Sequence, residues 1–213
     1  MRFLITAGPT REPLDAVRFL SNRSSGAMGV SLANAAASAG AAHDVTLLLG
    51  PVDSAVAGLV DAAVTVARFD TAAALEALLS DRFAACDVLV MAAAVADFRA
   101  AQTLPGKAKR QGEMVLTLAA TPDLVAGCAA RKRDDQAVVA FALEEPERLE
   151  ARAVEKMRRK GVDAIVANPL RTMDAGEIEA MLLTADGRRL APGAMAKPDF
   201  AAWLVEQAAA LRG

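Results

Sequence analysis

The sequence predicts a doubly wound α/β fold, with a mostly parallel sheet, helices on both of its faces, a small β-hairpin appendage and a C-terminal helix. Three observations lead to this prediction. Short apolar runs without polar alternation recur along the chain, which is typical of parallel strands buried on both faces. Helix-like segments separate most of these runs, in the order expected of βαβ units. Hydrophobic residues make up 54% of the 213 residues and aromatic residues only 4%, which favours alanine-rich helices on a buried sheet.

Six apolar runs are the predicted strands of the sheet, and five segments are the predicted helices. The strands are residues 3–7, 45–49, 63–67, 87–92, 137–143 and 163–167. The helices are residues 26–40, 70–84, 121–132, 144–160 and 198–211. Gly40 and Gly161 suit helix ends in the left-handed conformation, and Thr121-Pro122 suits an N-cap followed by the first helical position. We therefore expect a Rossmann-like sheet with ligands at the carboxyl ends of its strands.

The chain is long enough for one large domain. We expect a single domain over residues 1–213, with a core over about 1–170 and with the hairpin and terminal helix over about 171–213. The hairpin prediction depends on Asp186-Gly187, which is a strong turn signal between two short apolar runs.

Composition and charge exclude several classes of function. The net charge of −2 argues against a general nucleic-acid surface, and the longest apolar run, residues 88–96, is too short to cross a bilayer. Cys86, Cys128 and the single His43 cannot form a usual structural zinc site, and so few cysteines favour a reducing, cytoplasmic compartment. Because Tyr is absent and His43 lies in a turn before a strand, we expect neither a catalytic triad nor a histidine base. Catalysis would then depend on lysine, arginine, carboxylate, amide and backbone dipoles.

Residues 21–29 are the candidate phosphate site. They lie between the first strand and the first helix, and they combine Ser24 and Ser25 with Gly26. The free N–H groups and the positive dipole end of a helix start attract phosphate. The same residues are equally compatible with an ordinary N-cap. The connection before this helix, residues 8–23, is unusually long, and such a loop at the end of a central strand is usually functional.

A second unusual segment, residues 93–112, follows the most hydrophobic strand. It leaves the strand at Asp97 and then carries Lys107, Lys109 and Arg110. Its polar, glycine-flanked composition predicts a mobile basic loop.

Five motifs, in order and over nearly the whole chain, resemble those of phosphopantothenate–cysteine ligases. They are Thr6-Ala7-Gly8-Pro9-Thr10-Arg11-Glu12-Pro13 with Val17-Arg18-Phe19-Leu20-Ser21-Asn22 and Ser24-Ser25-Gly26-x-Met28-Gly29; Ala93-Ala94-Val95-Ala96-Asp97-Phe98 with Lys107-x-Lys109; Thr121-Pro122-Asp123-Leu124-Val125; Phe141-Ala142-x-Glu144; and Val166-Ala167-Asn168. The resemblance implies a nucleotide-binding α/β synthetase domain. The chain departs from the family at three positions, because the family often has His at Arg23, Lys at Ala27 and Thr at Glu145.

The resemblance implies the ligation of 4′-phosphopantothenate to cysteine in coenzyme A biosynthesis. In the bacterial type, the carboxylate attacks the α-phosphate of CTP to give an acyl-cytidylate and pyrophosphate, and the cysteine amine then displaces CMP. Mg²⁺ is the expected cofactor and CTP the expected co-substrate, although no hydrogen-bond code in the sequence separates CTP from ATP. No flavin is expected in this chain. The flavin-dependent decarboxylase that many bacteria fuse in front of this domain is a candidate partner on a separate chain.

Asn22, Lys107 and Arg18 are the candidate catalytic residues by this resemblance. Asn22 would help form or hold the acyl-cytidylate, since an amide donates to an oxyanion and accepts from an amine without titrating. Lys107 would neutralise phosphate charge as its loop closes, and Arg18 would meet the pantothenate side. Arg18 is equally compatible with a plain salt bridge.

The candidate nucleotide-binding residues come from several separate segments of the chain. They are Gly8, Ser24, Ser25, Gly26, Met91, Ala92, Ala93, Asp97, Lys107, Pro122, Asp123, Leu124, Val125, Phe141, Lys156 and Lys160. Asp97 would hold Mg²⁺ through the triphosphate, since magnesium takes one or two carboxylates plus phosphate oxygens. Phe141 is also compatible with a core position, and Lys156 and Lys160 with the surface of a helix that is charged all round.

By resemblance we expect a homodimer, with neither nucleic acid nor membrane as a partner. Its candidate contacts are residues 113–118, which alternate like a short exposed strand, and the hairpin near Asp186-Gly187. An NAD(P)-binding oxidoreductase and a non-catalytic nucleotide-binding subunit remain as alternatives. The oxidoreductase is disfavoured because the first turn lacks G-x-G-x-x-G and no acid ends the second strand at Leu49-Gly50.

Overall fold

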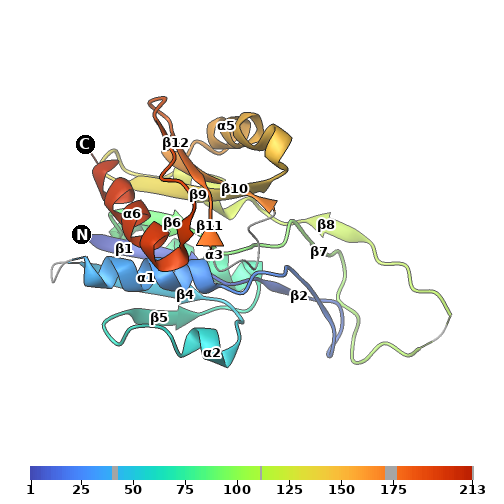
Figure 1. Cartoon of the computed structure of the whole chain (residues 1–213). Helices are drawn as coiled ribbons and strands as arrows, with labels where there is room; N and C mark the ends of the chain where they lie inside the picture. The colour runs from blue at the N-terminus through green and yellow to red at the C-terminus, as the bar shows by residue number, and fades with distance from the viewer. Residues whose placement is uncertain (40–42, 111, 171–176, 213) are drawn as a thin grey trace.

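The computed structural model describes the chain except residues 40–42, 111, 171–176 and 213, and its centre is one twisted sheet (Figure 1). The strand order is β13-β12-β10-β9-β6-β1-β4-β5. The strands are β1 (Arg2–Ala7), β4 (Asp44–Leu49), β5 (Thr65–Arg68), β6 (Val88–Met91), β9 (Ala137–Glu144), β10 (Ala164–Pro169), β12 (Met181–Thr184) and β13 (Arg189–Leu190). All neighbours from β10 to β5 in this order pair in parallel. The β10–β12 pair and the β12–β13 pair are antiparallel. This order confirms the predicted Rossmann-like, mostly parallel sheet.

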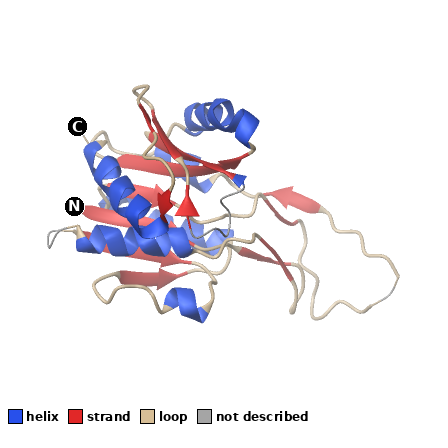
Figure 2. Cartoon of the chain, in the orientation of Figure 1, coloured by secondary structure: helices blue, strands red, loops and turns tan. Residues whose placement is uncertain are grey.

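Helices cover both faces of this sheet (Figure 2). On one face lie α1 (Ala27–Ser38) and α6 (Lys197–Ala210), and on the other lie α3 (Ala72–Arg82), α4 (Leu124–Ala129) and α5 (Leu149–Lys160). The side chains of strand β1 alternate between the two faces of the sheet, and both faces are covered. Phe3 and Ile5 join the first cluster and Leu4 joins the second, and each is at most 1% exposed. The absence of polar alternation in the sequence is explained by this double burial.

The remaining short elements connect these layers. They are α2 (Ser54–Ala57), the 3₁₀ turns η1 (Phe83–Ala85) and η2 (Pro146–Arg148), and the strand pairs β2 (Arg11–Pro13) with β3 (Phe19–Ser21), β7 (Phe98–Ala100) with β8 (Leu118–Ala120), and β11 (Glu177–Ile178) with β14 (Met195–Ala196). The long connection after β1 is thus a small hairpin. No helix within the described ranges is long and apolar enough to span a membrane.

The hairpin predicted at Asp186-Gly187 is confirmed, with Gly187 at φ 92°. Its strands β12 and β13 extend the central sheet beyond β10, because β12 pairs antiparallel with β10. Ile178 belongs instead to the separate pair of β11 with β14. The final helix α6 then packs against α1 on the sheet face.

Three local predictions were wrong or shifted. Residues 113–117 are not a strand, because the ladder partner of β7 is the next segment, β8. Thr121 is not the N-cap of α4, since the Asp123 carboxylate accepts the N–H of Ala126 at 3.2 Å and the helix begins after it. The strand predicted over 63–67 is β5, which begins two residues later and ends one residue later. Gly40, the predicted end of α1, lies outside the described residues.

Candidate functional site

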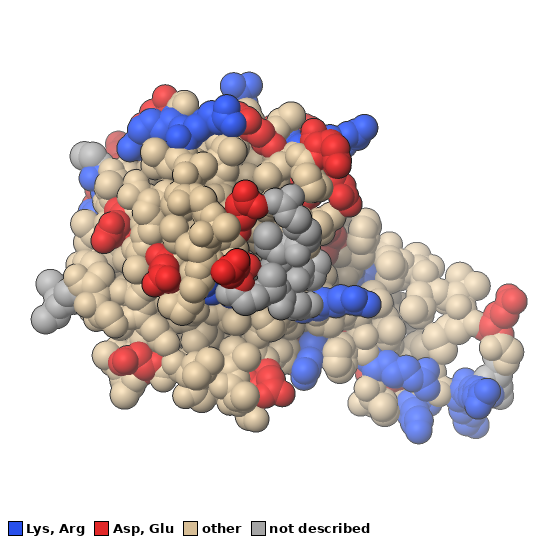
Figure 3. Space-filling view, in the orientation of Figure 1, with Lys and Arg blue, Asp and Glu red and all other residues tan. Residues whose placement is uncertain are grey.

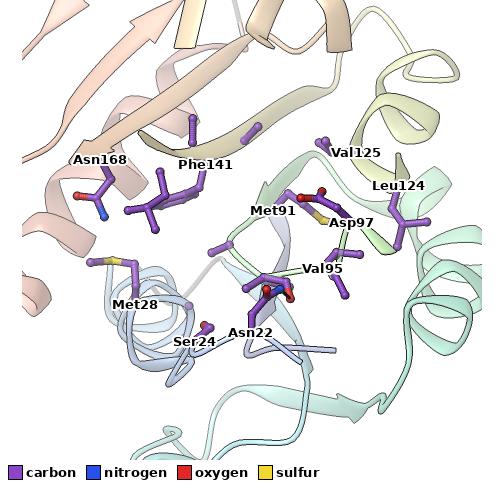
Figure 4. A pocket seen from close by; sticks show the side chains of 18 of the residues that line it. Asn22, Ser24, Met28, Met91, Val95, Asp97, Leu124, Val125, Phe141 and Asn168 are labelled. Atoms are coloured by element: carbon purple, nitrogen blue, oxygen red, sulfur yellow. Dashed lines mark hydrogen bonds between the residues drawn. The ribbon is translucent and has the colours of Figure 1, made fainter. Parts of the chain in front are cut away.

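A cavity of about 920 Å³ opens at the carboxyl ends of the parallel strands (Figure 4). Most predicted site residues line it. They are Asn22, Ser24, Ser25, Gly26, Met91, Ala92, Ala93, Asp97, Pro122, Asp123, Leu124, Val125, Phe141, Lys156 and Lys160. In Figure 4, Asn22 and Ser24 lie between two sides of the cavity, with Asp97 and Leu124 on one side and Phe141 on the other. Gly8, Arg18 and Lys107 do not line it.

The start of α1 forms the floor of the cavity, and glycine is required there. Gly26 is the N-cap at φ 78°, and Gly8 turns the chain after β1 at φ 84°. A Cβ added at Gly26 would lie 2.5 Å from Val52 Cγ1, and one added at Gly29 would lie 2.4 Å from Ala7 Cβ. The helix start can therefore approach the end of β1 only without these side chains. Gly8 does not line the cavity, but a Cβ added at Gly26 would lie 3.2 Å from the Gly8 Cα atom.

The two serines before α1 point at its first N–H groups. Ser24 Oγ accepts the N–H of Gly26 at 3.3 Å, and Ser25 Oγ accepts the N–H of Ala27 at 3.4 Å. Both bonds are long, and neither serine is the N-cap, since that position is Gly26. The hydroxyls and the helix dipole therefore face the same cavity, which is the arrangement expected of an anion site.

The loop after β6 forms the central wall, and Asn22 is attached to it. The Asn22 amide donates from Nδ2 to the Ala94 carbonyl oxygen at 2.8 Å. Thr6 Oγ1 accepts the N–H of Ala93 at 2.9 Å, so β1 also holds this loop. Among the described residues, no hydrogen-bond partner is found for the side-chain oxygen of Asn22. That oxygen can therefore accept a hydrogen bond from a ligand.

Cations outnumber carboxylates around the cavity. Arg23, Lys156, Arg159, Lys160 and Lys197 line it, against Asp97 and Asp123. This positive excess suits a polyanionic ligand. Figure 3 shows Lys and Arg side chains along the upper edge of the molecule, near α5 and the β12–β13 hairpin, with Asp and Glu side chains among them.

Two of these lysines are paired with carboxylates in the structure. Lys160 Nζ lies 2.5 Å from Asp123 Oδ2, and Lys156 Nζ lies 2.5 Å from Glu144 Oε1. Burial alone would raise the pKa of Asp123, but the hydrogen bonds from Lys160 and from the Ala126 N–H outweigh it and lower the pKa. A phosphate ligand would therefore have to compete with Asp123 and Glu144 for these cations.

Lys107 and Arg18 lie outside the cavity, in two segments that contact each other. Lys107 belongs to the arm, which we define as β7, β8 and the described residues between them. Arg18 belongs to the turn between β2 and β3. Arg18 Nη2 donates to the Ala108 carbonyl at 3.1 Å, and the Ala16 N–H donates to the Gly106 carbonyl at 3.0 Å. These hydrogen bonds join the segment around Lys107, which the sequence predicted as part of a mobile basic loop, to this turn.

Several residues that line the cavity were missed as site candidates. Among them are Arg23, Arg159, Asn168 and Lys197. Asn168 stands in the last matched motif and at the carboxyl end of β10, which is a signal that could have found it. Arg159 and Lys197 had no such signal, since they lie on helices whose place beside the cavity depends on the fold.

A preassembled metal centre does not occur among the described residues, which contain no group of three or more His, Cys, Asp or Glu side chains able to hold a metal ion. The exposed carboxylate of Asp97 lines the cavity as a single oxygen donor group. One carboxylate fits a Mg²⁺ ion that arrives on a nucleotide, since magnesium commonly takes one or two carboxylates plus phosphate oxygens.

Comparison with known proteins gives a family. The chain matches, over residues 1–211, the family described as DNA/pantothenate metabolism flavoprotein C-terminal domain. It is 43% identical over 176 residues to a cysteine/cysteine sulfinic acid decarboxylase from an unknown prokaryotic organism, with 82% of this chain and 47% of that protein covered. It is 41% identical over 202 residues to the coenzyme A biosynthesis bifunctional protein CoaBC of Mycobacterium tuberculosis (strain ATCC 25618 / H37Rv), with 87% and 46% covered. The chain spans about half the length of these curated relatives.

Solved structures agree with this result. The C-terminal domain of a coenzyme A biosynthesis bifunctional protein CoaBC superposes with a TM-score of 0.80 at 30% identity, covering 97% of this chain and 92% of that one. The DNA/pantothenate metabolism flavoprotein from Streptococcus pneumoniae has a TM-score of 0.81 at 19% identity, covering 99% of both chains, which is a likeness of fold. With nearly every residue matched, this chain belongs to the DNA/pantothenate metabolism flavoprotein C-terminal domain family.

Proposed function

We propose that this chain is a phosphopantothenate–cysteine ligase domain, which joins 4′-phosphopantothenate to cysteine in coenzyme A biosynthesis and consumes CTP. The observation that supports this most directly is the shared cavity, in which the Asn22 amide, the start of α1 and the cations of α5 face one another. The names of the relatives, coenzyme A biosynthesis bifunctional proteins, support the pathway.

The reaction brings two anions together, and the site suits this requirement. Two unit charges 4 Å apart repel by about 4 kcal/mol at an effective dielectric constant of about 20. In our proposal Lys156 and Lys160 exchange their carboxylate partners for the triphosphate, and the N–H groups at the start of α1 add a fixed positive field. Lys107 would join them from the arm, and Arg18 would face the pantothenate side. These roles for Arg18 and Lys107 require a movement or a second subunit, since neither residue lines the cavity.

The first step forms a bond between the substrate carboxylate and the α-phosphorus of CTP and breaks the α–β phosphoanhydride, so that pyrophosphate leaves. Positioning and charge stabilisation suffice for such a transfer, and no covalent nucleophile is required. A Mg²⁺ ion bound with the nucleotide would neutralise phosphate charge. Asp97 would hold it through the triphosphate.

In the second step the cysteine amine attacks the acyl carbonyl, and the bond from the acyl carbon to the phosphate oxygen breaks. The amine gives up a proton to water, the amide forms and CMP leaves. The Asn22 N–H group can donate to the developing oxyanion, and its side-chain oxygen can accept from the attacking amine. The base and ribose would lie among Met91, Ala92 and Ala93, the turn Pro122 to Val125, and Phe141. The small side chains of Ala92 and Ala93 allow the backbone to approach a base edge.

We also propose a homodimer. Four apolar side chains of the arm are exposed, with Met114 at 48%, Val115 at 91%, Leu116 at 39% and Leu118 at 44%. A lone chain would leave this surface in water, which soluble monomers rarely do over a contiguous patch. A flavin-dependent decarboxylase is the proposed functional partner.

A turnover assay tests the function directly. Purified protein is incubated with 4′-phosphopantothenate, Mg²⁺ and either CTP or ATP, with and without cysteine, and pyrophosphate and amide are measured. We expect pyrophosphate release that requires both phosphopantothenate and CTP, and amide only when cysteine is present. Nucleotide binding without turnover would favour a non-catalytic subunit, and tight NADH binding without turnover an oxidoreductase. Faster turnover with ATP than with CTP would show that ATP is the preferred co-substrate.

A further inference from the structure

Thr10 lies outside the cavity and is completely buried. It follows β1 and precedes β2, so it lies at the point where the chain leaves the central strand for the hairpin. A fully buried hydroxyl is costly unless it is hydrogen-bonded, because burial removes its contacts with water. The partners of Thr10 therefore indicate why a threonine stands there.

All three polar groups of Thr10 bind segments that carry candidate site residues. Its hydroxyl Oγ1 accepts the N–H of Ala96 at 3.0 Å, one residue before Asp97. Its own N–H donates to the Ala94 carbonyl at 3.2 Å. Its carbonyl accepts from Ser21 Oγ at 2.8 Å, one residue before Asn22.

Asn22 belongs to the same hydrogen-bond network, because its side-chain amide donates to the same Ala94 carbonyl at 2.8 Å. The segment that carries Asn22 and the loop that carries Asp97 are therefore tied to one buried residue as well as to each other. Their separation in sequence is large, so no local turn could fix the relative position of the two side chains.

We propose that Thr10 is a positioning residue for the reaction, and that its buried hydroxyl fixes the Asp97 loop relative to Asn22. This inference rests on the proposed function, because it assumes that both side chains act on the same bound substrates. Thr10 touches no substrate itself. A displacement of about 1 Å at a reacting group can cost on the order of a hundredfold in rate.

The test compares one variant that lacks the hydroxyl with one that keeps it. Thr10→Val keeps the shape but removes the acceptor of the Ala96 N–H, whereas Thr10→Ser keeps the hydroxyl. The readout is the single-turnover rate constant of acyl-nucleotide formation, which does not depend on the fraction of folded enzyme. We expect Thr10→Val to lower it at least about tenfold, with the KM for CTP changed less, and Thr10→Ser to stay close to the wild type.

Thr184→Val is the matched control. Thr184 is 3% exposed, and its Oγ1 accepts the N–H of Arg188 at 3.0 Å in the hairpin, outside the cavity. This variant should lose thermal stability to a similar degree while its single-turnover rate stays unchanged. An equal rate loss in both variants, or an unchanged rate in Thr10→Val, would overturn the proposal.

Two further outcomes are separated by the same experiment. If Thr10→Val does not fold, Thr10→Ala removes the same acceptor of the Ala96 N–H without filling the space of the hydroxyl, and an unchanged rate in that variant overturns the proposal. If the wild type forms no acyl-nucleotide from phosphopantothenate, the proposed function fails, and the positioning role fails with it. An active wild type with a fully active Thr10→Val leaves the function standing and removes only Thr10.

Discussion

The carboxylate of Asp15 accepts the main-chain N–H of Ala108 at 3.1 Å and thereby joins the turn between β2 and β3 to the residue after Lys107. The same side chain is 1% exposed, and its other oxygen accepts the N–H groups of Val17 and Arg18 at 2.7 and 2.8 Å. The Val17 N–H is the main cause of a lowered pKa for Asp15, with Ala108, Arg18 N–H and the Arg18 charge adding to it. One ionised carboxylate thus organises the surroundings of both Arg18 and Lys107.

Replacing Asp15 should release the segment around Lys107. In Asp15→Asn, the side-chain NH₂ group cannot accept a hydrogen bond, so one of the bound N–H groups loses its partner. We expect trypsin to cleave after Lys107 or Lys109 at least about fivefold faster than in the wild type, since cleavage tracks the population of the open segment. Time courses followed by mass spectrometry give the rates.

Asp53→Asn is the control for that variant. Asp53 Oδ1 accepts the N–H of Ala55 at 2.8 Å, which is the same type of bond at the start of α2. It should leave the cleavage rate in the arm unchanged. An Asp15→Asn protein that is cut no faster than the wild type would show that the arm is held by other contacts.

Lys160 should contribute to nucleotide affinity. In Lys160→Gln the ammonium that lies 2.5 Å from Asp123 is lost, and a charge-assisted bond to phosphate of about 1.5–3 kcal/mol is lost with it. We expect the KM for CTP to rise on the order of tenfold or more. Arg158→Gln, an exposed position on the same last turn of α5 that does not line the cavity, is the control and should change KM less than about twofold. Equal effects in both variants would indicate only a general loss of positive charge.

The sheet was predictable from the sequence because its strands are apolar on both faces, as Phe3 and Leu4 show. The cavity was largely predictable as well, because the carboxyl ends of parallel strands meet at one edge and the motifs stand at those ends. Asn22 and Asp97 were found in this way, and both line the cavity. Their actual roles in catalysis remain predictions.

Contacts between distant segments were not predictable. After the chain turns back, β7 can pair with any of several short runs, and the sequence does not specify which one. The strand was therefore expected a few residues before β8. The pairing of Lys156 with Glu144 and of Lys160 with Asp123 requires α5 to lie beside β9 and α4. Thr121 has the propensity of an N-cap residue, but Asp123, which also has it, is the N-cap of α4 in the structure.

Acid should weaken the fold through Asp87. The hydrogen bond from the Arg2 side chain is the main cause that lowers the pKa of Asp87 to about 2. An unfolded aspartate has a pKa of about 3.9, so this ion pair stabilises the folded state above that pH and is lost as the pH falls toward 2. We expect the urea midpoint of Asp87→Asn to be lower than that of the wild type at pH 7, and the difference to shrink between pH 4 and 2. Asp81→Asn, at an exposed pair with Arg82, should show no such pH dependence. A difference that stays constant down to pH 2 would contradict the ion-pair explanation.

The exposed arm should hold two chains together. In Val115→Asp a charge is placed on a side chain that is 91% exposed in one chain and would be buried in the proposed dimer. We expect the wild type to sediment as a dimer at micromolar concentration and this variant to shift toward the monomer. Leu59→Asp, at a side chain 65% exposed after α2, is the control and should stay dimeric. A wild type that is monodisperse as a monomer would refute the dimer.

Asn22→Asp should separate nucleotide binding from amide formation. A carboxylate at this position faces the Ala94 carbonyl, cannot donate to it, and adds negative charge where an acyl-phosphate would lie. Loss of one preorganised donor to an oxyanion costs about a hundredfold to a thousandfold in kcat, so we expect amide formation to fall by at least about a hundredfold. The affinity for CTP, measured by calorimetry, should stay within a few-fold of the wild-type value, because the cations on α5 are unchanged.

Asn34→Asp is the matched control, since Asn34 Nδ2 donates to the Leu59 carbonyl at 2.7 Å outside the cavity, and it should keep full turnover. An Asn22→Asp protein with full activity would remove Asn22 from the mechanism, because no structural compensation can restore a donor that the side chain no longer has.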